Sequence, residues 1–382
     1  MLVTNRSKTD KEREQTKELL IGKTLKELRQ WAQEHNLERF RADQIYHWIY
    51  KKWEDDPEKF TNISKELRKW LKENALFHTL ERIEKVEAPD SVKYLFKTRD
   101  GHLVETVLIK EKDHWTLCVS TQIGCNVGCK FCATAKDGLI RNLTAAEIVD
   151  QLLWVQKDIR DLPKPWHKVR NIVFMGMGEP LANFNNVKKA VEIFIDQKGV
   201  DISKRRLTIS SSGILHQLEK MAQDPILKHV NLAISLNAPD QETREKIMPI
   251  TRTNPFNKLW EFLVNYPLPE GRKITLEYVL IKDVNDLPQH AQKLAALVKP
   301  HRKRFKVNLI PFNPSPILPY ERPPQERIYQ FQKTLLDNAI IATIRWSKGQ
   351  DVFGACGQLR AKREIPLIGN QNPLLSRSVK ET

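Results

Sequence analysis

Short apolar runs alternate with longer amphipathic segments between residues 116 and 346, and this alternation constrains the fold more than any other feature. The apolar runs read as strands: TLCVSTQI (116–123), NIVFMGMG (171–178), RLTISSS (206–212), VNLAISLN (230–237), ITLEYVLI (274–281), FKVNLIPF (305–312) and IIATIRW (340–346). Apolar residues recur at helical spacing in the segments between them. Strands that are apolar throughout are buried on both faces, and strand–helix alternation places them in a parallel sheet. The chain is therefore predicted to be an α/β protein whose sheet curls towards a barrel, with its chemistry at the carboxyl ends of the strands.

The chain has 382 residues, more than the roughly 250–300 at which a single core stops growing, so we expect more than one domain. Before residue 79 the pattern is first polar and aperiodic, then helical with many Lys and Arg, which predicts a tail followed by a small RNA-contacting domain. Alternating runs then predict a strand meander that joins this domain to the barrel. The expected units are a flexible tail (1–19), a helical domain (20–78), the meander (79–110), the barrel (111–347) and a C-terminal segment with a basic tail (348–382).

The charge of the chain is strongly positive. Lys and Arg number 63 against 47 Asp and Glu, which gives a formal net charge of +16. Part of this charge comes in blocks, namely SKRR (203–206), HRKRFK (301–306) and LRAKR (359–363). Such blocks are typical of proteins with a polyanion partner, because Lys and Arg that neutralise phosphates release counterions. The charge therefore predicts nucleic acid as a partner.

Nothing in the sequence predicts export or insertion into a membrane. The opening MLVTNRSKTDKEREQTKE lacks the apolar stretch of a signal peptide. No apolar run approaches the roughly 18 residues of a membrane-spanning helix. We therefore expect a cytoplasmic protein, in which cysteines remain thiols and serve metal binding or catalysis rather than disulfides.

Three of the five cysteines lie within GCNVGCKFCAT (124–134), directly after the first predicted strand of the parallel sheet. The spacing of Cys125, Cys129 and Cys132 gathers three thiolates on one compact loop, which predicts a metal site. A structural zinc site needs a fourth ligand, and the candidates for it are His114, Cys118 and Cys356. An iron–sulfur cluster normally takes four cysteines, so three would leave one iron open to a small molecule.

This spacing at a strand end resembles the signature of radical S-adenosylmethionine enzymes, in which a [4Fe–4S] cluster reduces S-adenosylmethionine to a 5′-deoxyadenosyl radical. Further motifs occur in the order seen in RNA adenine methyltransferases of the RlmN and Cfr type: VETVLI, LCVSTQIGCNVGCKFCATA, MGMGEPLAN, SKRRLTISSSG, AISLNAP, EYVLI, VNDLPQHA, NLIPFNP and ACGQL. The resemblance covers about residues 20–365. It implies a radical-SAM partial (β/α)6-type barrel with a small N-terminal helical, helix-hairpin-helix-like domain.

The resemblance also implies which residues hold the cofactors. Cys125, Cys129 and Cys132 match the ligands of the [4Fe–4S] cluster, and two molecules of S-adenosylmethionine are used per turnover. The positions that match contacts to S-adenosylmethionine are Gly178, Glu179, Ser210, Ser235, Leu236, Asn237 and Asn313. Glu179 has a carboxylate suited to the ammonium group of this cofactor. Asn237 departs from the family, which more often has histidine there; asparagine still donates and accepts hydrogen bonds but carries no charge.

The two remaining cysteines and one glutamate match the reactive residues of the family. Relatives first methylate the cysteine that matches Cys356 and then abstract hydrogen from that methyl group, so that the carbon adds to adenine as a protein–RNA adduct. The resemblance assigns Glu105 as the base that removes the adenine proton. It assigns Cys118 as the thiol that attacks the Cys356 sulfur and releases the product with a transient disulfide. The family usually has alanine where Gly354 stands, which predicts a looser loop here.

The expected function is methylation of adenine carbon 2 in 23S ribosomal RNA, and also in transfer RNA. Pro180 after Glu179 looks more like the carbon-2 group than like relatives that methylate carbon 8 and confer antibiotic resistance. A third hypothesis, from another class, is a zinc-stabilised RNA-binding module without catalysis. An electron donor such as flavodoxin or ferredoxin and a monomeric state are further expectations.

Overall fold

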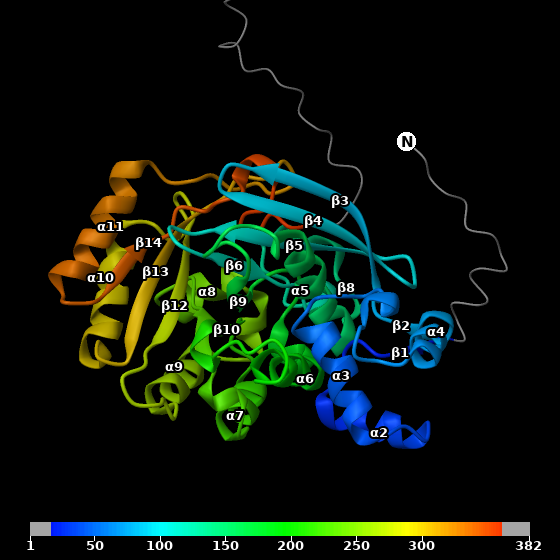
Figure 1. Cartoon of the computed structure of the whole chain (residues 1–382). Helices are drawn as coiled ribbons and strands as arrows, with labels where there is room; N and C mark the ends of the chain where they lie inside the picture. Colours follow the sequence, from blue (N-terminus) through cyan, green and yellow to red (C-terminus); the bar gives the residue numbers. More distant parts are fainter. Residues whose placement is uncertain (1–16, 361–382) are drawn as a thin grey trace, which may run out of the picture.

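The computed structural model describes residues 17–360, and one ten-stranded sheet runs through it (Figure 1). Its strand order is β14-β13-β12-β11-β10-β9-β6-β5-β4-β3. The parallel strands are β6 (Trp115–Cys118), β9 (Val169–Phe174), β10 (Leu207–Ser211), β11 (Asn231–Ser235), β12 (Ile274–Leu280), β13 (Phe305–Pro311) and β14 (Ala342–Ile344). Each of them pairs with the next one along the chain, as successive right-handed strand–helix units do.

Helices connect the parallel strands and pack on the outer side of the curled sheet (Figure 1). They are α5 (Ala145–Ile159), α6 (Phe184–Ile195), α7 (Leu215–Gln223), α8 (Gln241–Ile247), α9 (Phe256–Asn265), α10 (Pro288–Val298) and α11 (Gln325–Asp337). Helix α5 begins with a capping box, in which the Thr144 side chain accepts from Glu147 N and Glu147 bonds back to the Thr144 backbone. Six strand–helix units and a closing strand confirm the predicted α/β fold of the partial (β/α)6 type. None of the helices within residues 17–360 is long and apolar enough to cross a membrane.

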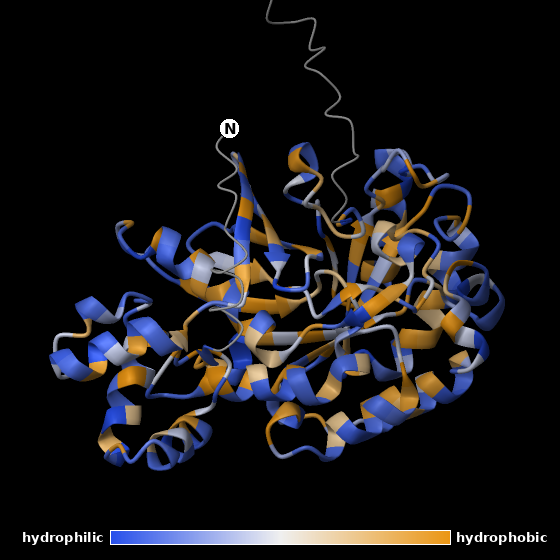
Figure 2. Cartoon of the chain, turned by 90° about the vertical axis from the view of Figure 1, so that its right-hand side faces the viewer, coloured by the Kyte–Doolittle hydropathy of each residue, from blue (hydrophilic) through white to orange (hydrophobic). Residues whose placement is uncertain are grey.

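The strands of the sheet are mostly hydrophobic, whereas the helices alternate hydrophobic and hydrophilic residues around their circumference (Figure 2). This is the pattern expected of a sheet covered by amphipathic helices, because only one side of each helix is removed from water. The fold therefore follows from the periodicities that the sequence shows.

The predicted meander is present, but it is not a separate connecting layer. Strands β3 (Leu80–Ala88), β4 (Ser91–Thr98) and β5 (Leu103–Lys110) pair antiparallel with one another. Strand β5 also pairs antiparallel with β6, so the meander extends the barrel sheet. Residues of β5 consequently lie beside the first parallel strand, where part of the site is built.

The N-terminal part contains α2 (Leu25–Glu34), α3 (Arg39–Tyr50) and α4 (Lys65–Asn74), together with the short parallel strands β1 (Glu18–Leu19) and β2 (Ala75–Leu76). These helices gather at one end of the molecule, beside α5 and α6 (Figure 1). The tail was predicted to extend through residue 19, but residues 18 and 19 form strand β1. Residues 1–16 and 361–382, which include most of the predicted tail and the basic C-terminus, lie outside the described residues.

One predicted strand is wrong in its extent. The run 116–123 was expected to be a single strand, but β6 ends at Cys118, and β7 (Gln122–Gly124) belongs to a separate hairpin with β8 (Leu139–Asn142). Buried polar groups cause the break, since Gln151 on α5 accepts a hydrogen bond from Ser120 N (2.8 Å) and donates to Ser120 O (2.9 Å). The first cysteine of the cluster therefore follows a hairpin strand rather than a strand of the barrel.

Candidate active site

One cavity collects most of the residues that the sequence singled out. Its lining includes Cys125, Cys129, Cys132, Gly178, Glu179, Ser210, Ser235, Asn237, Asn313 and Cys356. It lies at the carboxyl ends of the parallel strands, and its empty volume, which continues into solvent, is about 970 Å³. Small-molecule sites occupy pockets of about 300–1,000 Å³. We call this space the cofactor cavity.

The loop after β7 brings the three clustered cysteines to the wall of the cofactor cavity. Gly124 starts this loop at φ +75°, and a Cβ there would lie 1.8 Å from the Gly138 carbonyl oxygen, so only glycine fits. The same carbonyl accepts from Cys125 N at 2.9 Å, which ties the first cysteine to the β7–β8 hairpin. Burial raises the pKa of the Cys125 thiol to about 12 and also raises the pKa of Cys129 and Cys132.

The chemistry of these donors can be tested against the implied cluster. Within residues 17–360, no three His, Cys, Asp or Glu side chains converge as ligands of one metal ion. A [4Fe–4S] cluster does not need such convergence, because each cysteine binds a separate iron atom. Three thiols at the wall of one cavity, with no fourth cysteine of the same loop, therefore fit a cluster with one iron left open to a small molecule.

The MGMGEP loop after β9 forms a second wall of the cofactor cavity. Gly178 has φ +103°, and a Cβ there would meet the Gln122 side chain at 2.5 Å, so the loop packs directly on β7. Glu179 is buried and accepts hydrogen bonds from the backbone N of Leu181 (3.2 Å) and Ser212 (2.7 Å). Burial raises the pKa of the Glu179 carboxyl against the opposing effect of these bonds. The loop thus holds a carboxyl group inside the cavity in a fixed position.

Strands β10 and β11 supply serines to the same cavity, but one predicted contact is not among its lining residues. Ser210 and Ser235 line the cavity, together with Ser211 and Ser212, which the sequence did not single out. Leu236 is fully buried and does not line the cavity. Leu236 follows the last residue of β11, and its side chain packs in the hydrophobic core instead.

Asn237 uses its side chain to hold the backbone. It lies at φ +58°, a left-handed conformation that asparagine tolerates better than most residues. Its Oδ1 accepts from Val279 N at 2.8 Å, and its Nδ2 contacts Met248 Sδ at 3.2 Å. The residue that departs from the family is therefore fitted to its own surroundings at the edge of the cavity.

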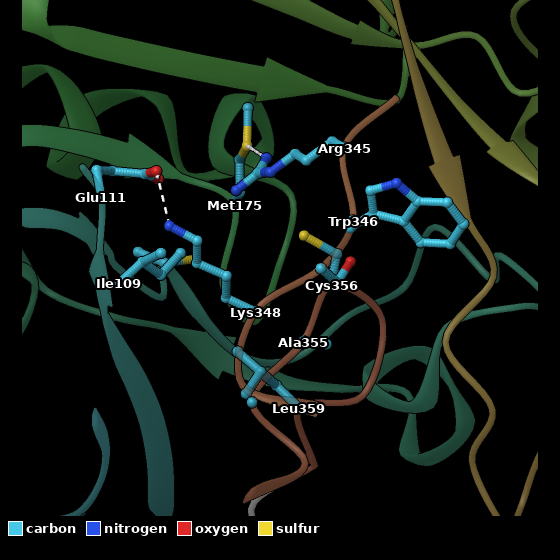
Figure 3. A pocket seen from close by; sticks show the side chains of 12 residues that line it. Ile109, Glu111, Met175, Arg345, Trp346, Lys348, Ala355, Cys356 and Leu359 are labelled. Carbon is cyan, nitrogen blue, oxygen red and sulfur yellow. Dashed lines mark hydrogen bonds and ion pairs between the residues drawn. The ribbon is translucent and has the colours of Figure 1, made fainter. Parts of the chain in front are cut away.

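A second pocket contains both remaining cysteines (Figure 3). Cys118 at the end of β6 and Cys356 in the C-terminal loop line it together, with Met175 and Arg345 beside them. Burial, and next the neighbouring Cys356, raise the pKa of the Cys118 thiol to about 12, while Arg345 acts in the opposite direction. Cys356 lines the cofactor cavity as well, so it alone of the two thiols is shared by both spaces. We call this second space the thiol pocket.

Asn313 anchors the loop that carries Cys356. Its Nδ2 donates to the Cys356 carbonyl oxygen at 3.0 Å and to Ser347 Oγ at 2.9 Å. The loop is also held at Gly357, whose carbonyl accepts from Ala133 N at 2.8 Å in the segment after the cluster cysteines. A Cβ on Gly354 would meet Val107 Cγ2 at 3.4 Å, an ordinary contact, so an alanine would have room here.

Glu105 is buried in β5 and lines neither space. Its carboxylate pairs with Lys93 Nζ at 3.1 Å and accepts from Arg360 N at 2.7 Å. Burial raises the pKa of Glu105, against the opposing effect of Lys93. The residue two positions on, Val107, pairs with Cys118 across the strands, which places Glu105 next to the thiol pocket along the same strand.

Two arginines of the site were missed by sequence reasoning. Arg244 is fully buried and donates to the carbonyl oxygens of Ser212, Ser235 and Leu236, which ties together the ends of β10 and β11. Arg345 after β14 lines both the cofactor cavity and the thiol pocket. Arg244 reaches Ser212 across 32 residues and Arg345 reaches Met175 across 170 residues, and neither arginine lies in a motif, so the sequence did not reveal them.

Comparisons with known proteins agree with this arrangement. Residues 19–77 match the family described as the ribosomal RNA large subunit methyltransferase N-terminal domain, and residues 119–295 match the radical SAM superfamily. A probable dual-specificity RNA methyltransferase RlmN of Aquifex aeolicus is 59% identical over 91% of this chain and 98% of its own length. The dual-specificity RNA methyltransferase RlmN of Nautilia profundicola is 43% identical over 85% of this chain and 93% of its own length.

A solved structure supports the same conclusion. The crystal structure of a radical SAM methyltransferase from Sphaerobacter thermophilus is 39% identical, with a TM-score of 0.85, and it matches 90% of this chain and 100% of that chain. These matches extend across both the N-terminal helices and the barrel. They leave no support for the alternative of a zinc-stabilised module without catalysis. The chain belongs to the RlmN family of radical SAM RNA methyltransferases.

Proposed function

We propose that this protein methylates carbon 2 of adenine in 23S ribosomal RNA and in transfer RNA. The observation that carries the proposal is the placement of Cys356, which lines the cofactor cavity on one side and shares the thiol pocket with Cys118 on the other. A carbon atom carried on the Cys356 sulfur has access to both spaces. The names of the relatives, dual-specificity RNA methyltransferases, support RNA as the substrate.

The cofactor cavity would hold the [4Fe–4S] cluster on Cys125, Cys129 and Cys132, with S-adenosylmethionine against the MGMGEP loop and the serines of β10 and β11. Together these cofactors supply a methyl group in one step and a hydrogen-abstracting radical in the next. Glu179 offers the carboxylate for an ammonium group, and the loops that surround it exclude water. An electron donor such as flavodoxin or ferredoxin would supply the electrons that this chemistry needs, and the protein would act as a monomer.

The chain's own residues then carry the carbon to the RNA. Cys356 accepts the methyl group, and its sulfur holds the carbon while that carbon becomes bonded to adenine. Glu105 takes the proton from the substituted adenine carbon, for which its raised pKa is suited once Arg360 N no longer covers the carboxylate. Cys118 attacks the Cys356 sulfur: the S–S bond forms, the C–S bond breaks, and its electron pair stays on the carbon, which takes up a proton as the new methyl group.

The product nucleoside tests this proposal. Reconstituted protein, S-adenosylmethionine and dithionite are incubated with a 23S ribosomal RNA fragment or with transfer RNA, and the digested nucleosides are analysed by mass spectrometry. We expect 2-methyladenosine from both RNAs, and none with Cys356→Ala. Detection of 8-methyladenosine instead would move the chain to the carbon-8 group, and methylation on a nitrogen would contradict the radical route.

A further inference from the structure

Two of the three basic blocks that the sequence showed, 203–206 and 301–306, lie at the same edge of the sheet although about a hundred residues separate them. Both lead into parallel strands, β10 and β13, so they lie at the amino-terminal mouth of the barrel, opposite the cofactor cavity, with the starts of β11 and β12 between them. Hydrogen bonds link the intervening segments: Asn231 donates to Arg205 O (2.8 Å), and Arg272 donates to Asn231 Oδ1 (3.3 Å). Lys273 next to it donates to Arg302 O at 3.4 Å.

The positive charge at this mouth is not neutralised by the protein. Within residues 17–360, no ion pair involves the side chains of Lys204, Arg205, Arg206, Lys228, Arg272, Lys273, Arg302, Lys303, Arg304 or Lys306. We call these residues the basic mouth. Burial and then repulsion from Arg205 lower the pKa of Arg272, and burial with Lys204, Lys228 and Arg272 lowers the pKa of His229. A cluster of like charges that repel one another is stabilised when an anion binds to it.

A cavity leads from the basic mouth into the barrel. It is lined by Arg205, Arg206 and Arg345, by Asn171 and by the hydroxyl groups of Ser203 and Thr208, and no carboxylate is among its lining residues. The amide of Asn171 is already engaged, because its Nδ2 lies 2.8 Å from His114 Nε2 and 3.3 Å from Thr116 Oγ1. Guanidinium and hydroxyl donors without a carboxylate suit phosphate oxygens. The cavity therefore has the chemistry of a phosphate site.

This cavity and the two spaces of the active site follow one another along the same strands. On β6, Thr116 lines the cavity at the mouth and Cys118 lines the thiol pocket. On β10, Thr208 lines the cavity at the mouth and Ser210 lines the cofactor cavity. Residues two apart on a strand face the same side and lie on the order of 7 Å apart. Thr116 in the cavity at the mouth and Cys118 in the thiol pocket are thus separated by a single two-residue repeat of β6.

Arg345 stands where the three spaces meet, because it lines the cavity at the mouth, the thiol pocket and the cofactor cavity. Figure 3 shows its side chain directed to Met175, with Cys356 close by. Arginine guanidinium planes stack on unstacked bases in RNA-binding proteins. An adenine that passes from the mouth to Cys356 would meet this side chain.

We propose that the basic mouth binds the backbone of the RNA substrate, and that the target adenine enters the barrel from this side, past Arg345, to reach Cys118 and Cys356. The inference rests on the proposed function and adds to it the face on which the substrate binds. Cofactors and RNA then approach the thiols from opposite ends of the barrel. Methylation of Cys356, which involves only the cofactor cavity, does not require the mouth.

The test compares charge-matched double variants. Arg205→Gln with Arg206→Gln removes two charges of the first block, and Arg302→Gln with Lys303→Gln removes two exposed charges of the second. Lys293→Gln with Lys333→Gln, on the outer helices α10 and α11, is the control with the same net charge. Binding of a synthetic stem-loop RNA with an adenine in its loop is measured between 50 and 300 mM salt, together with mass-spectrometric methylation of Cys356 without RNA.

Both mouth variants should bind RNA about tenfold or more weakly, since charge-assisted hydrogen bonds to phosphate oxygens are lost. The slope of log K against log salt should become shallower by roughly 0.7–0.9 for each phosphate that the variant no longer neutralises. The control variant should bind like the wild type, and Cys356 should be methylated in all four proteins, which also shows that the variants fold.

Unchanged affinity and slope in both mouth variants would overturn the inference, and so would an equally weakened control. An effect on the rate with flavodoxin as reductant, with RNA binding intact, would instead assign the mouth to an acidic donor protein. These failures differ from failure of the proposed function, in which the wild type itself makes neither methylated Cys356 nor methylated adenosine.

Discussion

At the scale of single residues, Asn313 connects the cofactor cavity with the loop that carries Cys356. Its side chain lines the cofactor cavity, while its Nδ2 holds the Cys356 carbonyl at 3.0 Å and Ser347 Oγ at 2.9 Å. Its Oδ1 in turn accepts from Arg322 at 3.4 Å. The loop that carries Cys356 is therefore positioned by a residue that also lines the cofactor cavity, so one amide links the loop to this cavity.

We predict that Asn313→Ala slows methylation of Cys356 on the order of tenfold, because two hydrogen bonds of about 0.5–1.5 kcal/mol each no longer hold the loop. The check is a time course of Cys356 methylation by mass spectrometry. Iron content should stay at the wild-type level, since the cluster cysteines are untouched. Asn338→Ala, at the end of α11, is the matched control. A wild-type rate in Asn313→Ala would show that the loop is held by its other contacts.

At the scale of elements, the sequence predicted most of what forms the site. Apolar runs placed every parallel strand, and the Thr144–Glu147 capping box placed the start of α5, because these signals are local. The strand 116–123 was wrong because its break depends on Gln151, a residue of the next helix that bonds to both backbone groups of Ser120. A contact between residues that are 31 positions apart does not change the local pattern of apolar and polar residues from which strands are predicted.

The sequence did not fully predict which of the selected side chains line the cofactor cavity. Ten of the thirteen residues selected from the sequence line one cavity, while Leu236, Cys118 and Glu105 do not. Leu236 packs in the hydrophobic core, and Cys118 and Glu105 belong to the adjoining strands β6 and β5. The division into a cofactor cavity and a thiol pocket could not be read from motifs, because it depends on how the C-terminal loop returns to β6.

At the scale of the whole molecule, one continuous hydrophobic core joins the N-terminal helices to the barrel. Polar contacts at the same junction centre on Asp150 of α5, which is fully buried and accepts from Thr79 N at 2.6 Å and Leu80 N at 2.8 Å. His78 lies between Asp150 (2.6 Å) and Asp55 (2.9 Å). The helical part is therefore fixed to the barrel and does not swing freely relative to the site.

This junction predicts a pH dependence of stability. Burial alone would lower the pKa of His78, but Asp150 and Asp55 outweigh it and raise the pKa to about 9. A histidine whose pKa is raised in the folded state stabilises that state fully at pH values below its unfolded-state pKa of about 6.5. This contribution, on the order of 3 kcal/mol, is lost as the pH rises from about 6.5 through 9.

The measurement is the thermal unfolding midpoint between pH 6 and pH 9.5 for the wild type and for His78→Gln. The midpoint difference between the two proteins should be large at pH 6 and small at pH 9.5. His102→Gln, at a more exposed histidine near Asp100 (3.8 Å), should follow the wild type. A difference that does not change with pH would mean that His78 contributes through packing rather than through its charge.

The central claim is that two thiols divide the reaction, with Cys356 carrying the carbon and Cys118 releasing it. The most direct measurement follows labelled RNA on a denaturing gel after incubation with Cys118→Ala, S-adenosylmethionine and reductant. We predict a nuclease-sensitive protein–RNA band, because the bond from Cys356 to adenine forms but no second sulfur is placed to break it. The band should be absent when Cys356→Ala is combined with Cys118→Ala. Normal turnover by Cys118→Ala without a trapped species would contradict the claim and leave Cys118 as a buried residue at the end of a strand.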